Sequence, residues 1–545
     1  MTGTQLSAIA ANGFLLLVRE SVRTTFSEFS PAVSSKVPTT RWAGIRNGRP
    51  CRIRFHSGSS RIRGGKGMTG ARRSLRKITP AVLQIATSSI IILKIENGMT
   101  LVDPSRGYSL DTSFIQQEHH TNPRRMYSIN GADWQYRVDH ERLRRQRLAR
   151  ARAEMEADDL GALVLFAGAN IRYITGSYQG NWKYNINIRY AVLPRGGEPV
   201  LFETAGSDMR NAMLDLPWLK DHIRPAMTWQ WAEGAIGEMA DKMVASILEV
   251  LKEHGVENEK IGLDNLDLPA LHAMEKAGLR VVNGWPAMSR ARVVKTVDEI
   301  EQLKMAAAIG DAAMWHVKHD WLKPGISERQ IEAKVHEFML SRGCEIIYDI
   351  IVASGGNTSP YRRWATDKLI QQGDLLIIDI NAVGPGGYFI DFVRTFKCAA
   401  KMTRQEIDLY RETYDSMYAG MENLRPGKTT ADVVAKFPEY DDDKYGTVTL
   451  QQFAHSIGIT LYEGMWMSRA YSMKYPAEIK ENMYFAIETF AGHPGLPQTC
   501  RLEENVLVTK GGPSVFTKME HMAEAVAGYR PGEFHHAEIF GYPQE

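Results

Sequence analysis

The alternation of apolar and polar residues changes near residue 137. Before that point, residues 1–130 show no sustained period of 3.6 or 2, so they predict neither an amphipathic helix nor a half-buried strand. Two apolar stretches, residues 13–18 and 81–93, are shorter than the roughly 18 to 20 residues that a membrane-spanning helix needs. We therefore predict a disordered extension over residues 1–130 and no membrane span.

After residue 137 the pattern becomes that of an alternating α/β domain. Helices and short apolar strands follow one another at residues 138–160 (helix), 162–166, 188–193 and 200–202 (strands), 233–254 (helix), 260–263 (strand), 268–276 (helix) and 279–282 (strand). A basic connector over residues 289–296 places a domain boundary near residue 290. The first folded domain is predicted to span residues 131–290.

Residues 291–545 predict a second folded domain. Its expected elements are helices at 298–318, 328–341, 403–424 and 431–436, and strands at 346–352, 374–380, 388–396, near 455, at 485–489 and at 502–508. A glycine-rich turn at residues 384–387 reverses the chain between two of these strands, which predicts a β-hairpin. The fold class is α/β (α+β), with two folded domains.

Composition and charge limit the compartment and the classes of partner that we expect for this chain. The chain has 545 residues, 44% hydrophobic and 24% charged, and its four cysteines are far apart, which favours a reducing, cytoplasmic compartment. Residues 1–100 hold sixteen Lys and Arg against three acids, a balance of +13, whereas the whole chain carries +3. The rest of the chain is therefore acidic, which argues against a nucleic-acid partner. The Arg-rich, acid-poor start is also typical of a mitochondrial transit peptide, which is the alternative to a disordered extension.

Candidate chemistry is concentrated in the predicted hairpin. Asp379 and Asn381 lie two residues apart on one strand, so they share a face, and Asp391 lies on the returning strand. The neighbouring residues are apolar. Because buried carboxylates are costly unless a cation compensates them, this pattern indicates a cation site.

Three further polar residues interrupt apolar strands. His455, Glu488 and Glu503 are each unremarkable alone, since a single core histidine or strand-end glutamate is common. Together with Asp379 and Asp391 they give four carboxylates and one imidazole. Two divalent cations would neutralise the four charges, and the mixed oxygen and nitrogen ligands suit Mn, Fe, Co or Zn.

These residues resemble the pita-bread metallopeptidase superfamily of the creatinase, aminopeptidase P and prolidase type, peptidase family 24. The resemblance rests on residues 379–396, on residues 455–458, and on Glu488 followed fifteen positions later by Glu503. It implies a creatinase-like N-terminal domain, a pita-bread catalytic domain and a homodimer. It also implies two metal ions bridged by a hydroxide, with the ligands Asp379, Asp391, His455, Glu488 and Glu503, and with Asn381 as the alternative ligand on the first strand.

The sequence departs from that family in three places. Asp391 lies twelve rather than eleven positions after Asp379, a histidine expected before the first strand is absent from residues 354–361, and Tyr462 stands where a second histidine is expected. The dimethylsulfoniopropionate lyase branch is similar in residues 171–175 and in the segment that ends at Trp182. In that branch an acid follows the metal histidine, and Glu463 is the nearest one here.

The predicted function is hydrolysis of a small C–N substrate, an Xaa-Pro-like peptide or an amide, with no nucleic-acid or membrane partner. The alternatives are C–S elimination of the dimethylsulfoniopropionate lyase type and a non-catalytic binding module. Each candidate residue has a role under these readings: Glu488 moves a proton, Tyr462 donates to an oxyanion, Glu463 is the base of an elimination, Arg501 orients Glu503, and Trp182 contacts substrate.

Overall fold

The computed structural model describes residues 138–178, 188–204, 206–230, 233–359, 363–437, 452–493 and 496–533, and the backbone of four strands near the N-terminus. The chain divides into two compact units, residues 1–112 and 113–545. In the first unit β1 (Ser7–Ala11) pairs with β2 (Phe14–Val18), and β3 (Ile91–Ile95) pairs with β4 (Gly98–Val102), both antiparallel. The rest of the predicted extension, residues 1–130, lies outside the described residues, so its disorder stays a prediction.

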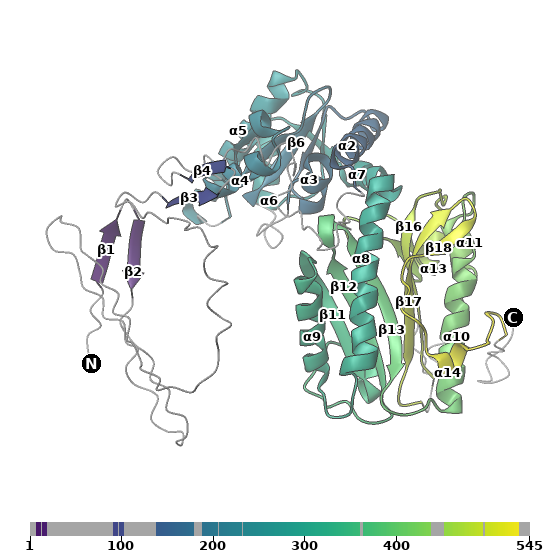
Figure 1. The fold of residues 1–545 in the computed structure, drawn as a ribbon. Helices are drawn as coiled ribbons and strands as arrows, with labels where there is room; N and C mark the ends of the chain where they lie inside the picture. The colour runs from purple at the N-terminus through teal and green to yellow at the C-terminus, as the bar shows by residue number, and fades with distance from the viewer. Residues whose placement is uncertain are drawn as a thin grey trace, which may run out of the picture. The chain divides into compact units, whose positions relative to one another are not determined.

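The second unit begins with a six-stranded mixed sheet in the order β10-β9-β5-β6-β7-β8. Its strands are β5 (Ala162–Leu165), β6 (Tyr190–Pro194), β7 (Val200–Glu203), β8 (Ile223–Pro225), β9 (Lys260–Leu263) and β10 (Arg280–Asn283). Helices lie on both faces (Figure 1): α2 (His140–Ala157), α3 (Gly168–Thr175), α4 (Ser207–Asp215), α5 (Ile236–Glu253), α6 (Leu268–Lys276) and α7 (Trp285–Val293).

The central strands are buried on both faces because they are apolar throughout and their side chains point alternately to the two sides of the sheet. In β5, Leu163 and Leu165 pack in the cluster that contains α2, whereas Ala162 and Val164 pack in the cluster that contains α5. Successive side chains point to opposite faces of a strand, so a continuous apolar run covers both.

Two antiparallel sheets form the remainder of the unit. The first has the order β11-β12-β13, with β11 (Ile346–Ser354), β12 (Leu375–Val383) and β13 (Phe389–Lys397). The second has the order β15-β14-β16-β17-β18, with β14 (Ala454–Ser456), β15 (Trp466–Met467), β16 (Tyr484–Ala491), β17 (Cys500–Thr509) and β18 (Gly512–Val515). The predicted hairpin is confirmed as β12–β13, and its turn residues Gly386 and Gly387 have φ of 81° and 88°, which favours glycine.

Helices cover the outer faces of these sheets (Figure 1). Helix α8 (Val297–His316) packs on β13, α9 (Glu328–Ser341) on β11, and α10 (Arg404–Met421) on β16 and β17. All three start at a reciprocal capping box, formed by Thr296 and Glu299, by Ser327 and Gln330, and by Thr403 and Glu406. None of the helices in the described ranges has the length and apolar character needed to cross a bilayer.

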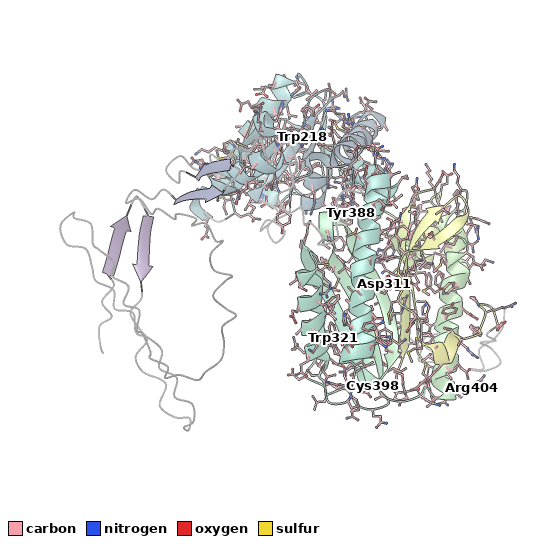
Figure 2. All side chains as sticks on the ribbon, in the orientation of Figure 1. Trp218, Asp311, Trp321, Tyr388, Cys398 and Arg404 are labelled. Atoms are coloured by element: carbon pink, nitrogen blue, oxygen red, sulfur yellow. The ribbon has the colours of Figure 1, made fainter. Side chains whose placement is uncertain are left out.

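Side chains join the two sheets where β13 meets β17. Thr395 Oγ1 donates to the Arg501 carbonyl over 2.7 Å, and Arg394 Nη1 donates to the Glu503 carbonyl over 2.8 Å. Figure 2 shows the densely packed side chains of this region, including Asp311 of α8, whose carboxylate accepts the backbone N–H groups of Lys518 and Met519. The polar faces of β12, β13, β16 and β17 are therefore held in a fixed register.

Candidate metal centre

Strand pairing places one row of polar side chains across the first sheet. Asn381 lies opposite Asp391 on β13 and opposite Asp349 on β11. Asp379 points to the same face, two residues before Asn381, and the Asn381 amide donates to Asp379 Oδ1 over 2.6 Å. Asp379, Asn381 and Asp391 are all buried.

The second sheet supplies the remaining candidates from three neighbouring strands. His455 lies on β14, and Glu488 on β16 is directly opposite Glu503 on β17. All three side chains are buried, and Glu503 has no exposed surface. These residues interrupt apolar strands, as the sequence indicated, because their strands form the inner wall of the domain.

Asp391, His455 and Glu503 come together as one cluster. One ligand atom from each lies within 4.8 Å of the others, and His455 Nε2 is 3.2 Å from Asp391 Oδ2. Neither carboxylate oxygen of Glu503 has a hydrogen-bond partner among the described residues. A buried carboxylate without partners is costly, so this donor set of two carboxylates and one imidazole fits a divalent cation.

Arg501 neutralises a different part of the site. Its guanidinium contacts Asp379 Oδ2 through Nη1 and Glu488 Oε2 through Nη2, whereas Glu503 Oε2 is 3.9 Å from Nη2. The other Glu488 oxygen accepts the side-chain amide of Gln452. The predicted contact of Arg501 with Glu503 is thus the longest of its three ion-pair contacts in this cluster.

The surplus of negative charge is visible in the ionisation of the cluster. Burial, with the charges of Asp391 and Glu488, raises the pKa of Glu503 well above its usual value. Burial also raises the pKa of Asp379 to about 7, although Arg501 opposes the shift. For His455, burial alone would lower the pKa, but the hydrogen bond and charge of Asp391 raise it overall. Each shift favours the presence of additional positive charge.

Two aromatic side chains lie beside His455. The Tyr462 ring centroid is 4.6 Å from that of His455, and Trp466 is paired with His455 across β14 and β15. Tyr462 and Trp466 are each 41% exposed. They therefore offer a surface that solvent, and a substrate, can reach.

Glu463 has a different environment from its neighbour Tyr462. Its buried carboxylate contacts Lys295 Nζ, lies 3.6 Å from Arg292 Nε, and accepts the backbone N–H of Ile459 and Thr460 over 2.8 and 3.2 Å. These contacts compensate its charge and close the loop between β14 and β15. Trp182, the predicted substrate contact, lies outside the described residues.

Sequence reasoning missed several residues of the site. Asp349 interrupts the apolar strand β11 and raises the pKa of Asp379 by its charge, so its isolated position in that strand was an available signal. Gln452 and Lys295 gave no such signal, because their partners Glu488 and Glu463 are distant in sequence.

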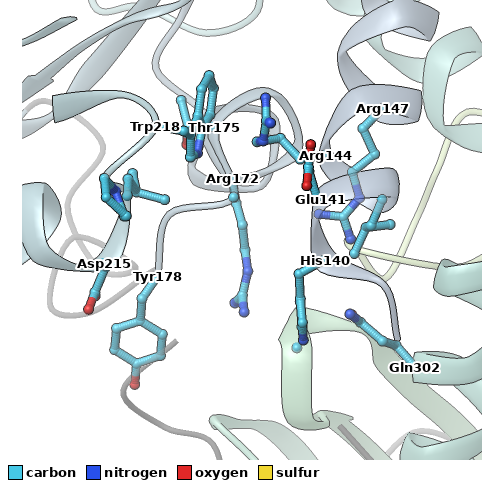
Figure 3. Close-up of a pocket in the computed structure, with 15 residues that line it drawn as sticks. His140, Glu141, Arg144, Arg147, Arg172, Thr175, Tyr178, Asp215, Trp218 and Gln302 are labelled. Atoms are coloured by element: carbon cyan, nitrogen blue, oxygen red, sulfur yellow. The ribbon is translucent and has the colours of Figure 1, made fainter. Parts of the chain in front are cut away.

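A separate pocket of about 380 Å³ lies between α2, α3 and the β12–β13 turn (Figure 3). Three arginines line it: Arg144, Arg147 and Arg172. Arg172 donates to both Glu345 oxygens over 2.6 and 2.8 Å, and Arg147 contacts the Tyr388 hydroxyl. None of the metal-cluster residues lines this pocket. The Arg172–Glu345 ion pair and the Arg147–Tyr388 hydrogen bond connect the six-stranded sheet region to the β11–β13 sheet.

Two family descriptions match this chain. Residues 301–510 match metallopeptidase family M24, and residues 147–294 match the creatinase/prolidase N-terminal domain. The chain is 25% identical over 392 residues to the dimethylsulfoniopropionate lyase DddP of Roseovarius nubinhibens, a region covering 69% of this chain and 85% of that protein. It is 30% identical over 235 residues to the Xaa-Pro dipeptidase of Pyrococcus furiosus, covering 42% of this chain and 64% of that protein.

A solved structure shows the same fold. The Xaa-Pro dipeptidase from Bacillus anthracis superimposes with a TM-score of 0.57 at 21% identity, covering 70% of this chain and 99% of that one. The predicted combination of a creatinase-like N-terminal domain with a pita-bread domain is therefore confirmed. Residues 301–510 therefore form a domain of metallopeptidase family M24, and residues 147–294 form a creatinase/prolidase N-terminal domain.

Proposed function

We propose that this chain is a metal-dependent hydrolase of small C–N substrates, with an Xaa-Pro dipeptide or a related amide as its substrate class. The observation that carries the proposal is Glu503, a fully buried carboxylate without a hydrogen-bond partner among the described residues, beside Asp391 and His455. The names of the Pyrococcus and Bacillus relatives support the substrate class.

The candidate ligand residues indicate which kind of metal ion would bind. Asp391, His455 and Glu503 would hold a divalent cation such as Mn, Fe, Co or Zn. When bound, such a cation makes water more acidic and polarises a substrate carbonyl. The sequence predicts two cations, and the second would take Asp379, or Asn381, together with Glu488.

Two side chains are suited to the proton chemistry of hydrolysis. Tyr462 is exposed beside His455, so its hydroxyl is the candidate donor to an oxygen that gains charge in the reaction. Glu488 has one oxygen bound by the Arg501 guanidinium and the other by the neutral amide of Gln452. We assign proton transfer to the second oxygen, because exchanging a neutral partner costs less than breaking an ion pair.

C–S elimination is the second candidate, because the lyase relative matches over 85% of its own length. Elimination of dimethylsulfoniopropionate removes one proton from carbon and releases dimethyl sulfide and acrylate, so it needs a base near the substrate. Glu463, the predicted base, is committed to Lys295 and to two backbone amides. This environment favours hydrolysis over elimination by Glu463.

The experiment is a parallel assay of metal-loaded protein on an Xaa-Pro dipeptide and on dimethylsulfoniopropionate. We expect dipeptide cleavage, and we expect Tyr462→Phe to lower kcat by about 10²-fold, the usual effect of removing one oxyanion donor. Tyr471→Phe is the matched control, because Tyr471 is 60% exposed and has no role in the proposed chemistry. Release of dimethyl sulfide without dipeptide cleavage would establish elimination instead. Turnover of neither substrate by metal-loaded protein would contradict both.

A further inference from the structure

The carboxylates of the metal centre divide into two groups by the partners they already have. Both oxygens of Asp379 are engaged, one by the Asn381 amide and the other by Arg501. Both oxygens of Glu488 are engaged as well, by Arg501 and by Gln452. Neither oxygen of Glu503 has a hydrogen-bond partner among the described residues, and its ion-pair contact with Arg501 is long, at 3.9 Å. A further cation is therefore required at Glu503, and not at Asp379 and Glu488, whose oxygens already have donors.

Arg501 is a permanent cation at the other side. A guanidinium does not lose its proton in proteins, and this one is 4% exposed, so water does not screen its charge. Its backbone is fixed at both polar groups: Arg501 N–H donates to Thr395 Oγ1 over 3.1 Å, and Thr395 Oγ1 donates to the Arg501 carbonyl. The strand register therefore directs the side chain between Asp379 and Glu488.

Asn381 removes one charge from the same side. It occupies the position opposite Asp391 where a second carboxylate would face the cluster, and it uses its N–H group to bind Asp379. A neutral amide that donates a hydrogen bond does not require a cation, whereas a carboxylate there would.

We propose that Arg501 takes the place of a second metal ion, so that each chain binds one divalent cation, at Asp391, His455 and Glu503. The inference rests on the proposed metal-dependent function and replaces the expected pair of cations by one cation and one guanidinium. Two positive charges on the same two carboxylates would repel each other in this buried site, and Arg501 is held there covalently. Asp379 and the Glu488 oxygen that contacts Arg501 then position the guanidinium, and the other Glu488 oxygen keeps its proposed role in proton transfer.

The test is the number of metal ions bound per chain. The full-length protein is stripped with a chelator, refilled with Mn²⁺, dialysed and measured by elemental analysis. We expect one equivalent for the wild type, and close to two for the double variant Arg501→Gln/Asn381→Asp, which removes the guanidinium and introduces a carboxylate. Arg404→Gln is the matched control, because Arg404 is an exposed arginine on α10 that pairs with Asp408 (Figure 2), and it should keep one equivalent.

Electron paramagnetic resonance of the Mn²⁺-loaded wild type gives a second measurement that does not depend on how the variants fold. We expect the spectrum of an isolated ion. Two equivalents in the wild type, a spectrum of two coupled ions, or a folded double variant that still binds one would each overturn the proposal about Arg501. No bound metal in the wild type would instead overturn the proposed function on which it rests.

Discussion

At the scale of single residues, the metal centre is a place where stability is given up for binding. Glu503 is fully buried, and neither of its oxygens is hydrogen-bonded by a described residue. A neutral side chain would be easier to bury at this position, because a desolvated charge without a partner is costly. The carboxylate is therefore explained by a ligand rather than by the packing of the strand.

We therefore expect Glu503→Gln to raise the free energy of unfolding of the metal-free protein and to lower that of the metal-loaded protein relative to the wild type. In chelator-treated protein, the variant is expected to unfold with a free energy about 1 to 3 kcal/mol higher than the wild type, since a buried carboxyl group without a hydrogen-bond partner among the described residues is replaced by a neutral amide. In metal-loaded samples the order should reverse, because only the wild type gains stability from binding. Chemical denaturation followed by circular dichroism, with and without Mn²⁺, measures both. A variant that keeps the wild-type stabilisation by metal would show that Glu503 is not a ligand.

At the scale of elements, the loop between β14 and β15 is positioned by one buried ion pair. Glu463 accepts the N–H groups of Ile459 and Thr460, and its charge is met by Lys295, which follows α7. Lys295 is also fixed by its backbone N–H, which donates to the Asn482 carbonyl over 2.8 Å. The loop that carries Tyr462 is thus connected to the segment between α7 and α8, and through Lys295 to the residues just before β16.

Removing only one partner of the Lys295–Glu463 ion pair should destabilise the protein strongly. Lys295→Met leaves the Glu463 carboxylate buried without its closest cation, and we expect a loss of about 3 to 5 kcal/mol in the free energy of unfolding. Adding Glu463→Gln removes that charge while keeping an oxygen for the Ile459 N–H, so the double variant should recover most of the loss. Urea denaturation of the wild type and of these two variants checks this. A loss below about 1 kcal/mol in Lys295→Met would mean that the pair is not desolvated.

The elements also show how far the sequence alone could lead. The β12–β13 hairpin follows from apolar alternation on either side of Gly384-Pro-Gly-Gly387, which are local signals, and the structure confirms it. The partners of Arg501 do not follow from local pattern. Its contact with Asp379 depends on how β17 is aligned with β12 and β13, which is fixed by long-range bonds such as that of Thr395 with Arg501. Strand faces could be predicted, whereas contacts between sheets could not.

At the scale of the whole molecule, the second unit is held together by charged contacts as well as by its core. Arg142 of α2 pairs with the buried Asp298 of α8 over 2.8 Å. Tyr388, which lies in the β12–β13 connection (labelled in Figure 2), donates to Glu299 Oε1 over 2.8 Å. The first contact connects the start of α2 to α8, the helix that packs on β13, and the second connects the β12–β13 connection to the same helix. The stability of the metal-binding region should therefore depend on α2 and not on the unit that precedes it.

Two truncations test this dependence. A chain that starts at residue 113 lacks the whole first unit, but it keeps α2 and all the metal-cluster residues, so we expect an unchanged number of bound metal ions and a nearly unchanged melting temperature. A chain that starts at residue 148 also loses Arg142 and Arg147, which leaves the Asp298 carboxylate buried without that partner, and it should melt at a markedly lower temperature. Differential scanning calorimetry and elemental analysis of both chains make the comparison. A large fall in melting temperature in the first truncation would show that the first unit stabilises the second, contrary to the division of the chain at residue 112.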